Sequence, residues 1–139
     1  MRRFLLPILL AAAFLMAGCS AEATSALPDL QGRYRVVAVF APDSAQAQRG
    51  ENALKSTPGL KERDIAWFVV GPNEVVSNIQ DKPSREDLEK IHDVDAFEVV
   101  LVGKDGSVKA TQLGGMNLQE IFDTIDNMPM RQQEMTHSQ

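Results

Sequence analysis

The sequence predicts one α/β domain in which a four-stranded mixed sheet is flanked by helices. Three observations predict this fold class. Short apolar runs rich in β-branched residues alternate with polar segments of helical character, which is typical of a buried sheet covered by helices. An Asp105-Gly106 pair separates the last two apolar runs, and this dipeptide is a strong signal for a hairpin. An apolar stripe with helical spacing follows, so a further helix is expected against the sheet.

The first half of the domain predicts a strand–helix–strand unit. Residues 34–40 and 65–70 are short apolar runs, as expected of strands that are buried on both faces. Residues 44–55 between them are polar and rich in Ala and Gln, with Asp43 or Ser44 as the expected N-cap of a helix. Two strands joined in this way run parallel, with a right-handed crossover.

The second half predicts a helix, a hairpin and a final helix. The helix over 84–92 begins at Ser84, which has the character of an N-cap. Residues 97–102 and 107–111 are expected to pair as antiparallel strands, and 117–127 carries the apolar stripe of the last helix. The complete order, strand–helix–strand–helix–strand–strand–helix, is that of the thioredoxin fold.

The first eighteen residues have the features of a secretory signal. Arg2 and Arg3 give a positive start, and residues 4–16 are apolar apart from Pro7. This apolar stretch is shorter than the roughly 20 residues that a membrane-spanning helix needs. A removable signal peptide over 1–18 is therefore expected.

The end of this signal resembles a bacterial lipobox. Residues 15–19 read Leu-Met-Ala-Gly-Cys, and the resemblance implies that the Cys19 sulfur receives a lipid before cleavage leaves Cys19 as the new N-terminus. Long acyl chains hold a protein on a bilayer, because each buried methylene contributes about 0.8 kcal/mol. Ordinary signal-peptidase cleavage after Ala23 is the alternative. A lipid-anchored, periplasm-facing location in the cell envelope is expected, and Ser20 favours the outer membrane if the host is Gram-negative.

The expected organisation is a signal peptide over 1–18, a flexible tether over 19–30, a thioredoxin-like domain over 31–135 and a disordered tail over 136–139. The tether follows from small and polar residues, including Ala, Ser and Thr.

Composition excludes several classes of function. Loss of Arg2 and Arg3 with the signal reduces the fourteen basic residues to twelve, against nineteen acidic residues, a net charge of −7. Such an acidic chain is not expected to bind nucleic acid. Cys19 is the only cysteine, so a lipid on it leaves a domain without disulfides, thiol catalysis or thiolate metal binding. Neither a cofactor nor a metal site is expected.

In the C-terminal third, residues 100–109 read Val-Leu-Val-Gly-Lys-Asp-Gly-Ser-Val-Lys, and 128–131 read Met-Pro-Met-Arg. With these motifs, this part of the chain resembles domain-of-unknown-function family 4174. Segments at 40–42 and 62–64 also match, so the resemblance covers roughly 30–135. It implies a thioredoxin-like fold, and a related domain in animal extracellular proteins with sushi repeats suggests a peroxiredoxin-like relationship. The candidate binding or family-motif residues are Lys104, Asp105, Gly106, Met128, Pro129, Met130 and Arg131.

The resemblance also shows which chemistry is missing. A redox-active thioredoxin-like protein carries a reactive cysteine just after the first strand, at a helix N-terminus that lowers the pKa of the thiol. Residues 40–46 contain no cysteine, and 93–97 lack the proline expected before the third strand. Thiol redox activity is therefore not expected.

Other residues admit both a structural and a functional interpretation. Ser44 stands where a nucleophile would lie, but the N-cap interpretation is favoured because no histidine lies in a recognisable arrangement with it. His92 is interpreted as a residue at a helix C-terminus. Asp93 and Asp95 are interpreted as a solvated loop rather than a carboxylate pair.

The C-terminal methionines and arginine are interpreted mainly as structural. Met116 and Met128 are expected to fill the core, whereas Met130 and Met135 are expected to dock the tail; a soft contact surface is the alternative. Arg131 is expected to pair with Asp126 or Asp123 and so pin the tail.

These features favour a cell-envelope lipoprotein whose redox-inactive thioredoxin-like domain is a binding module, with the membrane and an envelope protein as partners. The first alternative is an enzyme of unassigned chemistry that uses carboxylates or Ser44. It requires a concave pocket with polar groups around the helix start after Phe40. The second alternative is a peroxiredoxin-like antioxidant role implied by the family relationship.

Overall fold

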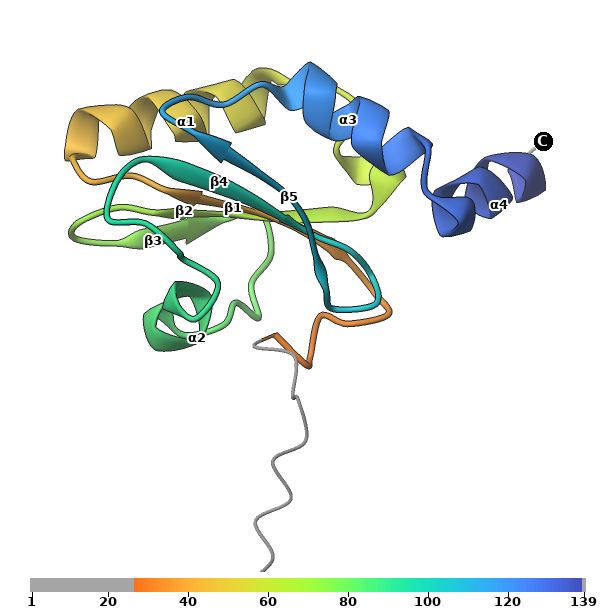
Figure 1. Cartoon of the computed structure of the whole chain (residues 1–139), viewed down its shortest axis with the longest axis horizontal. Helices are drawn as coiled ribbons and strands as arrows, with labels where there is room; N and C mark the ends of the chain where they lie inside the picture. Colours follow the sequence, from red (N-terminus) through yellow and green to blue (C-terminus); the bar gives the residue numbers. More distant parts are fainter. Residues whose placement is uncertain (1–26, 139) are drawn as a thin grey trace, which may run out of the picture.

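Residues 27–138 fold around one mixed five-stranded sheet in the computed structural model of the chain (Figure 1). Its strand order is β3-β2-β1-β4-β5. Strands β1 and β2 are parallel, and every other neighbouring pair is antiparallel. The strands are β1 (Arg35–Phe40), β2 (Ile65–Val70), β3 (Val75–Ser77), β4 (Glu98–Val102) and β5 (Val108–Leu113). The α/β class with a mixed sheet is thereby confirmed.

Helices cover both faces of the sheet. Helices α1 and α3 lie on one face and α2 on the other, while α4 lies beyond the sheet, next to the end of α3 (Figure 1). The helices are α1 (Ser44–Ser56), α2 (Arg85–Glu89), α3 (Leu118–Asp126) and α4 (Pro129–His137), with a short 3₁₀ turn, η1 (Lys61–Arg63), before β2. None of the helices in the described part of the chain is long and apolar enough to cross a membrane.

Two apolar cores hold these layers together. Every residue of β1, β2 and β4 is buried, as the continuous apolar runs predict. One core joins the sheet to α1 and α3, and it contains Leu54, Ile121 and Ile125. The other core lies on the face of α2 and contains Leu88.

The prediction of four strands is wrong, because a short edge strand was missed. Strand β3 has only three half-buried residues, which is too short for an apolar pattern to develop. It turns back from β2 at Gly71, whose N–H donates to the Glu74 carbonyl at 3.0 Å. The Asn78 side chain extends the pairing, since it accepts from the Trp67 N–H at 2.8 Å and donates to the Ile65 carbonyl at 3.0 Å.

The helices also differ from their predicted bounds. Helix α2 ends at Glu89, so the expected extension to residue 92 is absent. Its N-cap is Ser84 as predicted, and Asp43 rather than Ser44 caps α1 by accepting from the Gln46 N–H at 2.8 Å. Helix α4 begins at Pro129, where the sequence predicted no further helix.

The ends of the domain extend further than the predicted boundaries. Leu27 and Leu30 are buried in the core on the α2 face, although the tether was predicted to reach residue 30. At the other end, α4 continues to His137, into the segment predicted as a disordered tail. The signal peptide, Cys19 and the first part of the tether lie outside the described residues.

Candidate functional site

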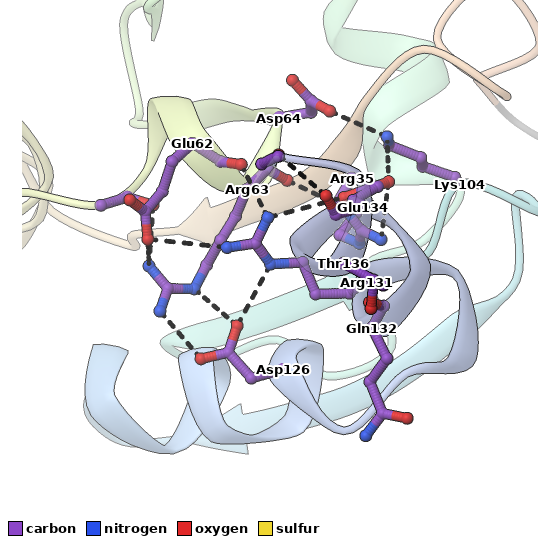
Figure 2. Close-up of polar contacts among 12 residues, drawn as sticks. Arg35, Glu62, Arg63, Asp64, Lys104, Asp126, Arg131, Gln132, Glu134 and Thr136 are labelled. Atoms are coloured by element: carbon purple, nitrogen blue, oxygen red, sulfur yellow. Dashed lines mark hydrogen bonds and ion pairs between the residues drawn. The ribbon is translucent and has the colours of Figure 1, made fainter.

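Eight charged side chains gather at the edge of the sheet where β1 begins, and we call them the charge cluster (Figure 2). They come from the start of β1, the turn before β2, the β4–β5 turn, the end of α3, and α4. Four are cations and four are anions, so the cluster carries no net charge. Its members are Arg35, Glu62, Arg63, Asp64, Lys104, Asp126, Arg131 and Glu134.

Glu134 of α4 lies at the centre of one half of the cluster. The two terminal nitrogens of Arg35 donate to the two carboxylate oxygens of Glu134, at 3.1 and 3.3 Å. The Lys104 ammonium donates to the same carboxylate at 2.6 Å and to Asp64 at 2.9 Å. Arg35 is only 1% exposed, so its charge depends on these partners rather than on water.

Asp126 of α3 lies at the centre of the other half. Arg63 donates to both of its carboxylate oxygens, from Nε at 3.0 Å and from Nη2 at 2.8 Å. Arg131 approaches the same carboxylate at 3.4 Å and donates to the Glu62 carbonyl at 3.0 Å. The Arg63 guanidinium also lies over the Phe122 ring, 4.2 Å from its centroid. The pairing of Arg131 with Asp126 agrees with the prediction, and it anchors α4 to α3.

The opposite edge of the sheet, where β1 ends, carries no such network among the described residues and is hollowed in several places. One hollow, of about 230 Å³, lies between α1 and the segment that leads into α3. Phe97 lines it together with Gln46 and Arg49 of α1 and with Met116, so its lining is both polar and apolar. Gly114 and Gly115 leave one side open, since a Cβ on either residue would meet nothing within 4 Å.

The second hollow, of about 150 Å³, lies on the α2 side of the same edge and includes Phe40, Pro42 and His92. The His92 ring stacks on Phe40 with centroids 4.2 Å apart. Its Nε2 is 4.0 Å from the Glu98 carboxylate, which is 1% exposed and accepts from the Asp93 N–H at 2.9 Å. His92 therefore contributes to a hollow, and it lies beyond the end of α2 rather than in its last turn.

Comparison with known families decides the family of this chain. A model of the family described as a domain of unknown function, DUF4174, matches residues 26–134. The chain belongs to this family. No curated protein matches it.

Several of the residues predicted to be family-motif residues occupy one edge of the domain. Lys104 and Arg131 both belong to the charge cluster and meet at Glu134, from which Arg131 is 3.7 Å away. Asp105 and Gly106 shape the turn that carries Lys104, because Asp105 accepts from the Ser107 N–H at 3.0 Å and Gly106 has a φ of +83°. The glycine-containing turn and the C-terminal motif thus form one structural unit.

The remaining motif residues build the joint between the last two helices. Met128 is extended at its backbone, with a φ of −73° and a ψ of 136°, and its side chain packs on the core as predicted. Pro129 is the first residue of α4, a position that suits its fixed φ. Met130 is 49% exposed and Met135 is 36% exposed, so these side chains do not dock the tail.

Sequence reasoning did not single out Arg35 and Glu134 as partners, although these two residues complete the cluster. They are 99 positions apart, so no local spacing reveals their pairing. The available signal was an arginine at the start of a strand whose other residues are apolar. The described residues contain no group of three or more His, Cys, Asp or Glu side chains that could hold a metal ion.

Hydrogen bonds within the cluster lower the pKa values of Asp126 and Glu134. The Arg63 guanidinium holds the pKa of Asp126 below its ordinary value. Burial raises the pKa of Glu134, but hydrogen bonds from Lys104 and Arg35 outweigh this effect and lower the pKa. Nearby, the Lys109 ammonium and the Ser107 N–H lower the pKa of Asp105 to about 2.

Acid is therefore expected to weaken the domain. The three carboxylates have lowered pKa values when folded, so their contribution is complete above their unfolded values, which are 3.8 for Asp and 4.5 for Glu. It is lost as the pH falls through the folded values. In urea titrations at different pH values, the free energy of unfolding should be constant above about pH 5 and should decrease as the pH is lowered towards about pH 2. An Asp126→Asn variant should show a shallower fall. Equal slopes for the two proteins would contradict the assigned role of Asp126.

Proposed function

We propose that this DUF4174 chain is a cell-envelope lipoprotein whose thioredoxin-like domain binds a peptide segment of another envelope protein without thiol chemistry. The observation that carries the proposal is the 230 Å³ hollow at the edge where β1 ends. An open hollow lined by both polar and apolar groups favours binding. The only cysteine of the chain is Cys19, which is assigned to the lipid.

The order of the sheet supports a thioredoxin-like interpretation. Without its short edge strand β3, the sheet reads β2-β1-β4-β5, with β1 and β2 parallel and the other pairs antiparallel. Helix α1 connects the parallel strands, and α3 follows the hairpin. This is the order expected from the sequence pattern. Strand β3 and helix α4 are additional elements that the pattern did not predict.

The lining of the hollow suits an extended peptide. The Gln46 side-chain oxygen is buried but has no hydrogen-bond partner among the described residues. A buried acceptor without a partner is unfavourable, so a ligand that brings an N–H donor gains from reaching it. Phe97 and Met116 offer apolar contact, and the absence of side chains at Gly114 and Gly115 leaves room for a backbone. These features together favour a peptide over a small, highly charged ligand.

Site-specific photocrosslinking in intact cells tests this proposal. A photoreactive phenylalanine analogue placed at Gln46, inside the hollow, is expected to give a discrete crosslinked adduct with an envelope protein. The matched control places the same group at Lys55, near the other end of α1, and is expected to give no such adduct. Equal adducts at both positions, or none at Gln46 in a chain of normal abundance, would count against binding at this surface.

The second hollow supports a second candidate function, that of an enzyme. Its candidate proton-transferring group is the His92 imidazole, whose Nε2 lies 3.4 Å from the Ala96 carbonyl and 4.0 Å from the buried Glu98 carboxylate, the latter beyond hydrogen-bond distance. Ser44 is not part of this hollow; it lies in the first turn of α1 after the capping residue Asp43 and lines a smaller hollow of about 110 Å³ beside Gly71 and Pro72. An enzyme of this kind would lose turnover on His92→Gln while keeping its fold, whereas the binding module would keep its Gln46 adduct.

A peroxiredoxin-like role makes a different demand. It needs a thiolate to attack the peroxide, and the only sulfhydryl in the sequence is that of Cys19. Because the proposed lipid occupies this sulfur, the mature protein is expected to show no thiol-dependent turnover of hydrogen peroxide. Turnover above a buffer control would restore this role.

A further inference from the structure

We propose that Arg35 and Lys104 form a carboxylate-binding site. Within the chain, the Glu134 carboxylate occupies this site. When α4 moves away, a carboxylate on a peptide segment of another protein binds there instead. This site, whose residues Figure 2 shows, does not rest on the proposed function. It lies at the edge of the sheet opposite to the hollows.

The geometry of the pair is that of carboxylate recognition. Arg35 presents two terminal nitrogens to two oxygens of one carboxylate, at 3.1 and 3.3 Å, and Lys104 adds a third donor at 2.6 Å. Paired donation by a planar guanidinium gives directional selectivity for a carboxylate, which a single ammonium does not.

The two cations are held in place without α4. Arg35 belongs to β1 and also donates to the Arg63 carbonyl at 3.0 Å, while Lys104 is fixed by Asp64 at 2.9 Å. The Arg35 side chain is buried, and its Nε has no hydrogen-bond partner in the described part of the chain. Departure of Glu134 would leave this buried cation without a carboxylate partner, a state that favours capture of another anion.

Helix α4 is attached in a way that allows exchange. Arg131 is its only buried residue, and Met130 and Met135 are exposed. The helix thus contributes no fully buried apolar side chain, and its attachment depends largely on the polar contacts of Arg131 and Glu134. Only two residues separate it from α3: Asn127, which is the C-cap of α3, and Met128, which is extended. Segments with few buried apolar contacts open at a lower free-energy cost than the core. A competing carboxylate that binds Arg35 offsets the loss of its ion pair with Glu134.

Binding of a labelled peptide to the detergent-solubilised mature protein tests the site. The probe is a synthetic copy of residues 127–139, compared with the same peptide carrying Glu134→Gln. In a Glu134→Gln protein, where the internal carboxylate is absent, the native peptide is expected to bind at least about tenfold more tightly than the Gln peptide. Wild-type protein should bind the native peptide more weakly, because its own α4 competes.

Two lysines of the β4–β5 hairpin, Lys104 in its turn and Lys109 in β5, supply a matched pair of variants. In the Glu134→Gln protein, Lys104→Gln is expected to weaken binding of the native peptide. Lys109→Gln should leave it unchanged, because Lys109 pairs with Asp105 at 2.8 Å. Equal binding of the two peptides, or no binding to a folded Glu134→Gln protein, would overturn the proposal.

A second measurement uses the wild-type protein, so it tests the proposal even if the Glu134→Gln protein does not fold. Amide hydrogen exchange over α4 is followed in the wild-type protein as each peptide is added. Displacement predicts that the native peptide accelerates exchange in α4 and that the Gln peptide does not. Unchanged exchange at millimolar concentrations of the native peptide would overturn the proposal independently of the variant.

Discussion

A Glu134→Gln variant is expected to unfold with a free energy about 2–4 kcal/mol lower than that of the wild-type chain, because removal of one partner strands a buried charge. The stranded charge is that of Arg35, which is 1% exposed. The amide of Gln can still accept one hydrogen bond, but it carries no charge to balance the guanidinium. Urea unfolding at neutral pH, followed by the fluorescence of the buried Trp67, measures the difference.

A double variant separates loss of the pair from loss of one partner. Replacing a buried ion pair with apolar groups of similar size is often neutral. Arg35→Met combined with Glu134→Gln is therefore expected to recover most of the lost free energy. Glu86→Gln is the control, since Glu86 is an exposed residue of α2 outside the cluster. A loss below about 0.5 kcal/mol for Glu134→Gln, similar to that of an ordinary surface substitution, would show that the cluster does not hold the domain together.

A Cys19→Ala variant is expected to leave the membrane fraction completely. The proposed anchor is the lipid on this sulfur, and the helices of the described residues include none that could replace it. Two or three acyl chains hold a protein stably on a bilayer, and removal of their attachment point removes the whole of that binding energy. Fractionation of cell envelopes, followed by immunoblotting with and without a high-salt wash, measures the change.

The competing cleavage signal provides the control for this experiment. An Ala23→Asp variant disrupts the Ala-x-Ala site but keeps the lipobox, so it should stay in the membrane fraction. If Cys19→Ala also stays in the membrane fraction after the salt wash, attachment does not depend on the lipid. If Ala23→Asp abolishes export, ordinary signal-peptidase cleavage is the route instead.

The sequence predicted the buried strands well because each is apolar on both faces. Residues 34–40 and 65–70 can be recognised in this way without knowledge of their neighbours. Strand β3 could not be recognised, since its three residues are half-buried and its pairing is completed by the Asn78 side chain. Whether an edge strand forms depends on the strand beside it, and a local sequence pattern contains no information about that neighbour.

Helix α4 was missed for a physical reason of a different kind. Proline disfavours helix in the residue before it, so Pro129 predicts an end, although it equally suits the first position of a new helix. The segment also lacks an apolar stripe, because Arg131 and Glu134 make its main contacts with the domain. A helix attached by charges has no apolar periodicity by which a sequence can reveal it.

The candidate site was predicted in part. A concave region near the helix start after Phe40 was the requirement set for an enzyme, and two hollows do lie at that edge. Their linings bring together Gln46, Phe97 and Gly114, which are far apart in the sequence. The motif residues Lys104 and Arg131 instead meet at the other edge, where each is paired with acids of the cluster.

The central claim is that the only cysteine of this DUF4174 chain is used as an anchor, so that its domain works without a thiol. Mass spectrometry of the N-terminal peptide from the native membrane protein tests this claim most directly. The account predicts a peptide that begins at Cys19 and carries the mass of its acyl chains. A peptide that begins at Thr24, or one that contains an unmodified Cys19, would contradict it.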